Sequence, residues 1–146
     1  MNASSQAITP ELTSKIAHLA VLFRAEFPDS RVDLSPWLTD PKTQCQLDPY
    51  SIDLSFYLPR HNNVLACRCV LMQVHFSKDL LLPTCQLKAI RASGYHCTER
   101  QWQFSTADWA FEGIFIPEIE HQERFNCLIN RIFKLFKHPN QVDTFW

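Results

Sequence analysis

Apolar residues recur every three or four positions in two stretches of the chain, one near each end, and this period is typical of amphipathic helices. The first stretch begins at Thr9-Pro10-Glu11, which supplies a hydroxyl cap, a proline at the first helical position and an acid in the first turn, and it ends at Pro28. The second runs from Glu118 to His138, with acids in its first turns and bases in its last, as the helix dipole favours. The apolar positions are Leu12, Ile16, Leu19, Ala20, Phe23 and Phe27, and then Phe125, Leu128, Ile129, Ile132, Phe133 and Phe136.

Between these helices, apolar and polar residues alternate in several segments, which is the pattern of a strand with one buried face. Residues 52–58 and 64–76 flank the turn sequence Pro59-Arg60-His61-Asn62-Asn63 and predict a β-hairpin. Residues 102–104 and 109–115 predict two further strands, and a short strand is expected at 32–34. Residues 84–93 fit a short helix that ends at Gly94, or alternatively a strand through Leu87 and Ala89.

The order of these elements predicts one α+β domain over residues 1–146. We expect an antiparallel sheet of about four strands, with the N-terminal and C-terminal amphipathic helices packed on one face. Hydrophobic residues make up 46% of the chain, which is enough for a core of its own. Residues 1–8 are predicted to be a flexible N-terminus and residues 139–146 a C-terminal tail.

Charge and hydropathy narrow the function classes. The formal net charge is −1, so we expect neither a nucleic acid nor an anionic membrane surface as a partner. No apolar run reaches the roughly 18 residues of a membrane span, and the polar segment Met1 to Thr9 is unlike a secretory signal. A cytoplasmic protein with reduced cysteines is therefore predicted.

The chain contains only two glycines. Loops that bind phosphates or dinucleotides need glycine where the backbone approaches the ligand, and neither of the standard fingerprints is present. We therefore expect no nucleotide cofactor.

Thiols and imidazoles are the first candidates for site chemistry. A zinc site would draw on Cys67, Cys69, Cys85 and Cys97, with His75 or His96 as substitutes. Their spacing lacks the C-x-x-C pair of structural zinc sites, so we predict no metal site and interpret the cysteines as small buried hydrophobes. A base and a nucleophile could be paired as His75 with Cys69 or as His96 with Cys97, but only because they are close in sequence. We therefore assign no catalytic residue.

Two single residues remain as candidates. Cys127 falls on the predicted outer face of the last helix with Arg124, Arg131 and Lys134, whose charges would favour a reactive thiolate. The alternative is an unreactive surface cysteine. Arg68 interrupts an apolar strand and is a candidate anion contact, unless it pairs with Asp53 or Glu112 or faces solvent.

Aromatic residues form the last group of candidates, because exposed aromatics mark contact surfaces. The candidate interaction or ligand surface consists of Trp102, Trp109, Phe111, Phe145 and Trp146. A terminal tryptophan can also fold back over its own core. If the aromatics line the face of the sheet away from the helices, that face is a binding site or a dimer interface.

Together these observations favour a non-enzymatic interaction or accessory module that binds a protein partner or itself. One alternative is a carrier for a small apolar ligand, with a pocket between sheet and helices. Another is a cysteine-dependent enzyme or redox switch centred on Cys127 or Cys97.

Overall fold

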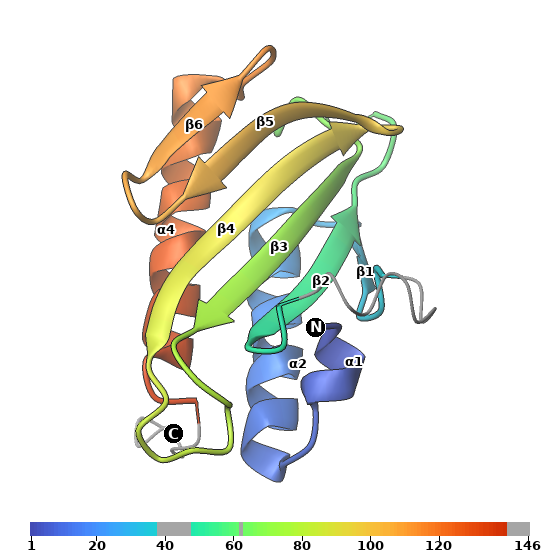
Figure 1. The fold of residues 1–146 in the computed structure, drawn as a ribbon. Helices are drawn as coiled ribbons and strands as arrows, with labels where there is room; N and C mark the ends of the chain where they lie inside the picture. Colours follow the sequence, from blue (N-terminus) through green and yellow to red (C-terminus); the bar gives the residue numbers. More distant parts are fainter. Residues whose placement is uncertain (38–47, 62, 140–146) are drawn as a thin grey trace.

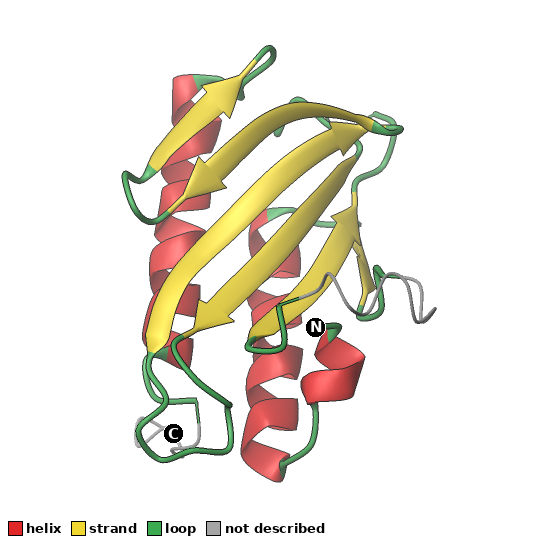
Figure 2. Cartoon of the chain, in the orientation of Figure 1, coloured by secondary structure: helices red, strands yellow, loops and turns green. Residues whose placement is uncertain are grey.

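Six strands form one antiparallel sheet in chain order, and two long helices cover one of its faces (Figures 1 and 2). The structure is a computed structural model that describes residues 1–37, 48–61 and 63–139. The elements are α1 (Ala3–Gln6), α2 (Pro10–Glu26), β1 (Arg31–Asp33), β2 (Ser51–Tyr57), β3 (Cys69–Phe76), β4 (Leu87–His96), β5 (Glu99–Ser105), β6 (Ala110–Gly113) and α4 (Ile119–Phe136). The predicted α+β class with an antiparallel sheet is confirmed, whereas the count of about four strands is wrong.

The two strands beyond the predicted four are β1, where a short strand was expected at 32–34, and β4. β1 has three residues and pairs with the end of β2, at one edge of the sheet. β4 occupies the segment that fitted either a helix or a strand, and it pairs with both β3 and β5. The strand alternative is therefore correct, and Gly94 lies inside this strand instead of ending a helix.

Both long helices form where their end signals predict them. In α2 the Thr9 hydroxyl accepts a hydrogen bond from the Leu12 amide at 3.1 Å, and Pro10 is the first helical residue. α4 has Glu120 in its first turn and Lys134 in its last. α2 packs behind β2 and β3, while α4 lies behind β4 to β6 (Figure 1). The described helices include none that is long and apolar enough to cross a membrane.

Aromatic rings fill the space between sheet and helices. Phe23 of α2 stacks on Phe56 of β2 with ring centroids 3.8 Å apart. Phe125 of α4 contacts Trp102, Phe104 and Phe111 from the β5–β6 half of the sheet. This side of the sheet is therefore the hydrophobic core.

Trp102 lies between the only two glycines of the chain, Gly94 on β4 and Gly113 on β6, which are its strand neighbours. A Cβ atom on Gly94 would lie 2.4 Å from the indole ring. A Cβ atom on Gly113 would lie 2.2 Å from the Gln101 carbonyl oxygen, and the φ of +152° at Gly113 also favours glycine. Both glycines are thus required by close packing around one tryptophan.

Candidate functional site

A cavity of about 380 Å³ opens at the end of the sheet where β2, β4 and β6 end and β3 and β5 begin. The β2–β3 connection supplies most of its wall, and the end of β4, β5 and the segment after β6 supply the rest. We call it the basic pocket. Its lining residues are Arg60, Asn63, Ala66, Cys67, Arg68, His96, Gln101 and Phe115.

Hydrogen bonds to the neighbouring strands hold the β2–β3 connection in place. The Arg68 amide donates to the Tyr95 carbonyl at 2.8 Å, and the Leu58 amide donates to the Arg68 carbonyl at 2.8 Å. The buried Trp102 indole donates to the Leu65 carbonyl at 2.6 Å. The wall of the basic pocket is therefore tied to the core through Trp102.

The basic pocket is lined by basic side chains and, among the described residues, by no acidic ones. Two guanidinium groups and the His96 imidazole line it, and none of the described lining residues carries a carboxylate. Nη1 of the half-buried Arg68 is shielded from solvent and has no hydrogen-bond partner among the described residues. Of the two predicted partners, Asp53 binds Met1 and Trp37 instead, and Glu112 lines a different cavity. Arg68 is therefore a donor that lacks an acceptor.

The Cys67 thiol lies in the wall of the basic pocket and is 3% exposed. Burial, followed by the neighbouring Cys69, raises the pKa of Cys67 to about 12. The thiol is therefore neutral at physiological pH and adds no negative charge to the pocket.

A second cavity, also of about 380 Å³, lies on the face of the sheet away from the helices. Arg91 and Arg100 line it, but so do Asp108 and Glu112, so its charges balance. Polar side chains predominate in both cavities, unlike the apolar pocket that a carrier would need between sheet and helices.

The predicted aromatic surface does not form as expected. Trp102 is fully buried and Phe111 is half-buried, and both contact Phe125 on the helix side of the sheet. Their alternation with polar neighbours identified the correct periodicity but not which face is covered. Trp109 is 38% exposed and packs against Phe104 and Phe133. Phe145 and Trp146 lie outside the described residues.

A different apolar surface follows β6. Four large side chains stand in solvent: Ile114 at 65% exposure, Phe115 at 65%, Ile116 at 47% and Ile119 at 70%. We call this group the apolar run. Alternation predicted a strand through residue 115, but β6 ends at Gly113. The signal that was missed is the unbroken sequence Ile114-Phe115-Ile116-Pro117, which has no alternation and so does not fit a half-buried strand.

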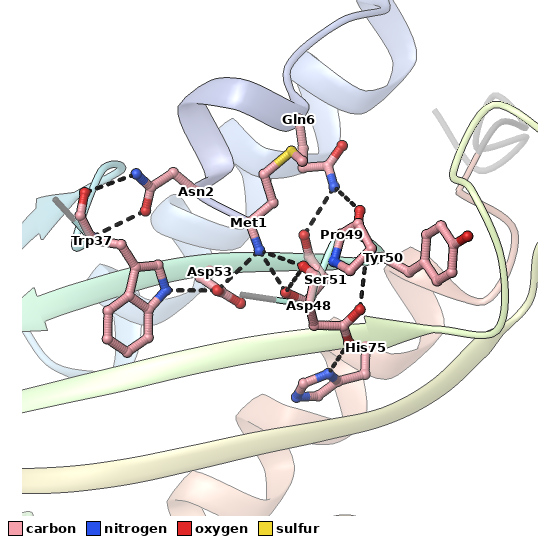
Figure 3. A network of polar contacts seen from close by, with 10 residues as sticks. All are labelled: Met1, Asn2, Gln6, Trp37, Asp48, Pro49, Tyr50, Ser51, Asp53 and His75. Carbon is pink, nitrogen blue, oxygen red and sulfur yellow. Dashed lines mark hydrogen bonds and ion pairs between the residues drawn. The ribbon is translucent and has the colours of Figure 1, made fainter. Parts of the chain in front are cut away.

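A network of polar contacts joins the first residues of the chain to β2 (Figure 3). The Met1 ammonium lies 3.1 Å from Oδ2 of Asp53 and 2.7 Å from the Ser51 hydroxyl. The Trp37 indole donates to the same Asp53 oxygen at 2.7 Å. The Asp53 residue is completely buried. Within residues 1–8, Ala3–Gln6 form α1 and the Met1 amine contacts this buried carboxylate.

His75 and Asp48 are hydrogen-bonded at the same place, with Nδ1 2.9 Å from Oδ2 (Figure 3). Burial alone would raise the pKa of Asp48, but hydrogen bonds from His75 and the Tyr50 amide, and nearby positive charge, hold that pKa below its ordinary value. Nε2 of His75 is buried without a hydrogen-bond partner among the described residues. An oriented imidazole without a bonded nucleophile does not make a catalytic pair.

The structure separates the other thiol candidates. Nδ1 of His75 contacts Asp48 and not the Cys69 thiol. Cys127 is exposed on α4, as predicted. Its neighbour Arg124 is occupied elsewhere, because the guanidinium contacts Glu26 and lies over the Phe27 ring.

Cys67, Cys69, Cys85 and Cys97 are free thiols and do not form a metal-ligand cluster in the described part of the chain. One group of potential ligand atoms does converge within 4.8 Å, on Glu118, Glu120 and His121. Both glutamates are exposed at the start of α4, where solvated acids are common, and the group carries no site assignment.

Thiol accessibility gives a direct check of this arrangement. After a short pulse of iodoacetamide on the native protein at pH 8, we expect Cys97 and Cys127 to be modified, since both are exposed. Cys67 should react at least about a hundredfold more slowly, because its raised pKa leaves very little thiolate and its sulfur is buried. Mass spectrometry of tryptic peptides measures each site. Comparable rates at Cys67 and Cys97 in the folded protein would contradict the described position of Cys67.

Comparison with known proteins gives a family but no described activity. A search of curated proteins found no match. A search of solved structures also found no match. A family model covers residues 4–138, which include both long helices, all six strands and every residue of the basic pocket. The chain therefore belongs to this family, which is described as a domain of unknown function.

Proposed function

We propose that this protein is a non-enzymatic interaction module that binds an extended segment of a protein partner along β6 and the apolar run. The observation that carries the proposal is the exposure of Ile114, Phe115, Ile116 and Ile119, each between 47% and 70%. Contiguous apolar side chains of this size are uncommon on monomeric proteins outside contact surfaces.

The position of β6 supports an extended partner. β6 is the last strand of the sheet, and within the described chain it pairs only with β5. The backbone groups on its other side are available to a further strand. The Phe115 amide donates to the Gln101 carbonyl at 3.2 Å, so the chain continues beside β5 beyond Gly113. Strand addition would provide backbone hydrogen bonds, and the apolar run would contact alternate side chains of the partner.

Charge complementarity favours an acidic residue in the partner segment. Phe115 belongs to the apolar run and also lines the basic pocket, where Arg60, Arg68 and His96 lie. An apolar segment that carries one Asp or Glu would match both features.

A display selection tests this proposal. Random twelve-residue peptides selected on the full chain should be enriched in segments with large apolar residues at alternate positions and one acid. Replacing both Ile114 and Ile119 by serine should weaken binding of a selected peptide about tenfold or more, measured by fluorescence anisotropy, because apolar area is lost from the contact. Neither residue lines the basic pocket.

Val21→Ser is the matched control, since Val21 is 64% exposed on α2, away from β6. This variant should bind the peptide like the unmodified protein. Equal affinity for the double variant and the control would overturn the proposal. Light scattering tests the alternative that the surface binds a second copy of the chain. If the unmodified protein is a dimer and the double variant is a monomer, the proposal of a different protein partner would be overturned.

A further inference from the structure

The basic pocket has the features of a ligand site in its own right. We propose that it binds the carboxylate or phosphate group of a small organic anion, with Arg68 as the central contact. This inference goes beyond the proposed function, because a free anion would bind whether or not a peptide lies along β6.

Arg68 has a side-chain donor without a partner among the described residues. Buried polar groups almost always have a hydrogen-bond partner, and Nη1 of Arg68 has none among the described residues. A guanidinium group presents its N–H donors in a planar fork, which matches the two oxygens of a carboxylate or phosphate. Arg68 is held in place by its own backbone, whose amide and carbonyl are both bonded to neighbouring strands. The structure therefore anchors the Arg68 backbone at the pocket, and the side chain keeps a donor without an acceptor among the described residues.

The wall of the basic pocket consists mainly of hydrogen-bond donors. Arg60, Arg68 and His96 are joined by the amides of Asn63 and Gln101, which can donate further hydrogen bonds. No described lining residue offers a competing carboxylate, in contrast to the cavity on the open face of the sheet. The neutral Cys67 thiol leaves this positive charge uncompensated.

The pocket also has room and apolar surface for the uncharged part of a ligand. The volume of about 380 Å³ falls in the range of small-molecule sites. Ala66 and the Phe115 ring provide apolar wall beside the cations. A compact anion with a flat apolar body, such as an aryl carboxylate or an aryl phosphate, would use both parts of the pocket.

Two non-glycine residues at the pocket have a left-handed backbone conformation. Ala66 has a φ of +53°, and Cys97, which follows His96, has a φ of +56°. Left-handed conformations are unfavourable for non-glycine residues, and such residues concentrate at functional sites. Two of them at one cavity support a binding role for that cavity.

Titration by nuclear magnetic resonance tests the proposal. Inorganic phosphate, benzoate and phenyl phosphate would each be added to nitrogen-15-labelled full-length protein at constant ionic strength. We expect saturable shifts of the Ala66 amide and the Gln101 side-chain amide, with an aryl anion binding more tightly than inorganic phosphate. Tighter binding of benzoate than of phenyl phosphate would identify a carboxylate site, and the reverse order a phosphate site. The absence of saturable shifts with all three probes would overturn the proposal.

Arg68→Met should weaken binding at least tenfold, whereas Arg131→Met, at an exposed position on α4, should leave it unchanged. If Arg68→Met lowers the melting temperature, the exposed Arg60→Met provides the second test, with a loss of severalfold expected. Unchanged affinity in the Arg68 and Arg60 variants would overturn the assignment. The Ile114→Ser, Ile119→Ser double variant should bind the anion normally, which separates this inference from the peptide surface.

Discussion

Replacing Trp102 by alanine should lower the free energy of unfolding by about 3–5 kcal/mol, the range for loss of a large aromatic from a core. Trp102 is fully buried and contacts Phe111 and Phe125. Its loss also leaves the Leu65 carbonyl without the indole donor that lies 2.6 Å away. Urea unfolding followed by circular dichroism measures the change. Trp109→Ala is the control and should cost about 1 kcal/mol, because Trp109 is 38% exposed.

Substitution of Gly94 tests whether the packing of the Trp102 ring against β4 contributes to stability. In the unmodified protein, Gly94→Ala should be strongly destabilising, since the new Cβ would lie 2.4 Å from the indole. In the Trp102→Ala protein the same substitution meets no indole and should cost much less, so the two changes should not be additive. Additive effects would contradict direct contact between Gly94 and the ring. A Trp102→Ala protein with the stability of the Trp109→Ala control would contradict the assignment of Trp102 to the core.

The helices were predictable because their signals are local. A cap, a proline, an acid and a period of three or four residues all lie within the segment that folds, and α2 begins at Pro10 as these signals indicate. β4 was ambiguous from the sequence because its identity depends on β3 and β5, its neighbours on both sides. The packing role of the two glycines was not predictable, because it depends on the strand register that places Trp102 between Gly94 and Gly113.

The candidate site was predictable only in part. Arg68 was identifiable because a charge inside an apolar segment needs an explanation, and the structure places it in the wall of a cavity. Its companions His96, Gln101 and Phe115 come from separate elements, and no sequence period links them. The burial of Trp102 and Phe111 against α4 was not predictable, because alternation does not say which face of a sheet the helices cover. Only the positions of α2 and α4 decide that question.

Asp53→Ala should lower the free energy of unfolding by about 1–3 kcal/mol, the cost of leaving buried hydrogen-bonding groups without a partner. The side chain is 1% exposed, and one of its oxygens accepts from the Trp37 indole and contacts the Met1 ammonium. Most of the effect should come from the indole, because the Met1 side chain is 45% exposed and solvent close to the ion pair screens it. Asp53→Asn, which keeps an oxygen for Trp37, should be intermediate. Asp79→Ala is the control, since this exposed carboxylate accepts only the Leu81 amide among the described residues.

Acetylating the Met1 amine separates the two contributions to the Asp53 site. In the chain that begins at Met1, acetylation removes the ammonium charge and should cost about 1 kcal/mol or less in the unmodified protein, because the ion pair is only partly buried and is screened by solvent. In Asp53→Ala it should cost less, since the carboxylate is already absent and the amine keeps only its contacts with the Ser51 hydroxyl and the Asp48 carbonyl. Equal effects of acetylation in both proteins, measured by urea unfolding, would show that Asp53 does not bind the amine. A loss on acetylation as large as that of Asp53→Ala would instead assign the stabilisation to the ion pair, and Trp37 would then be a minor contact.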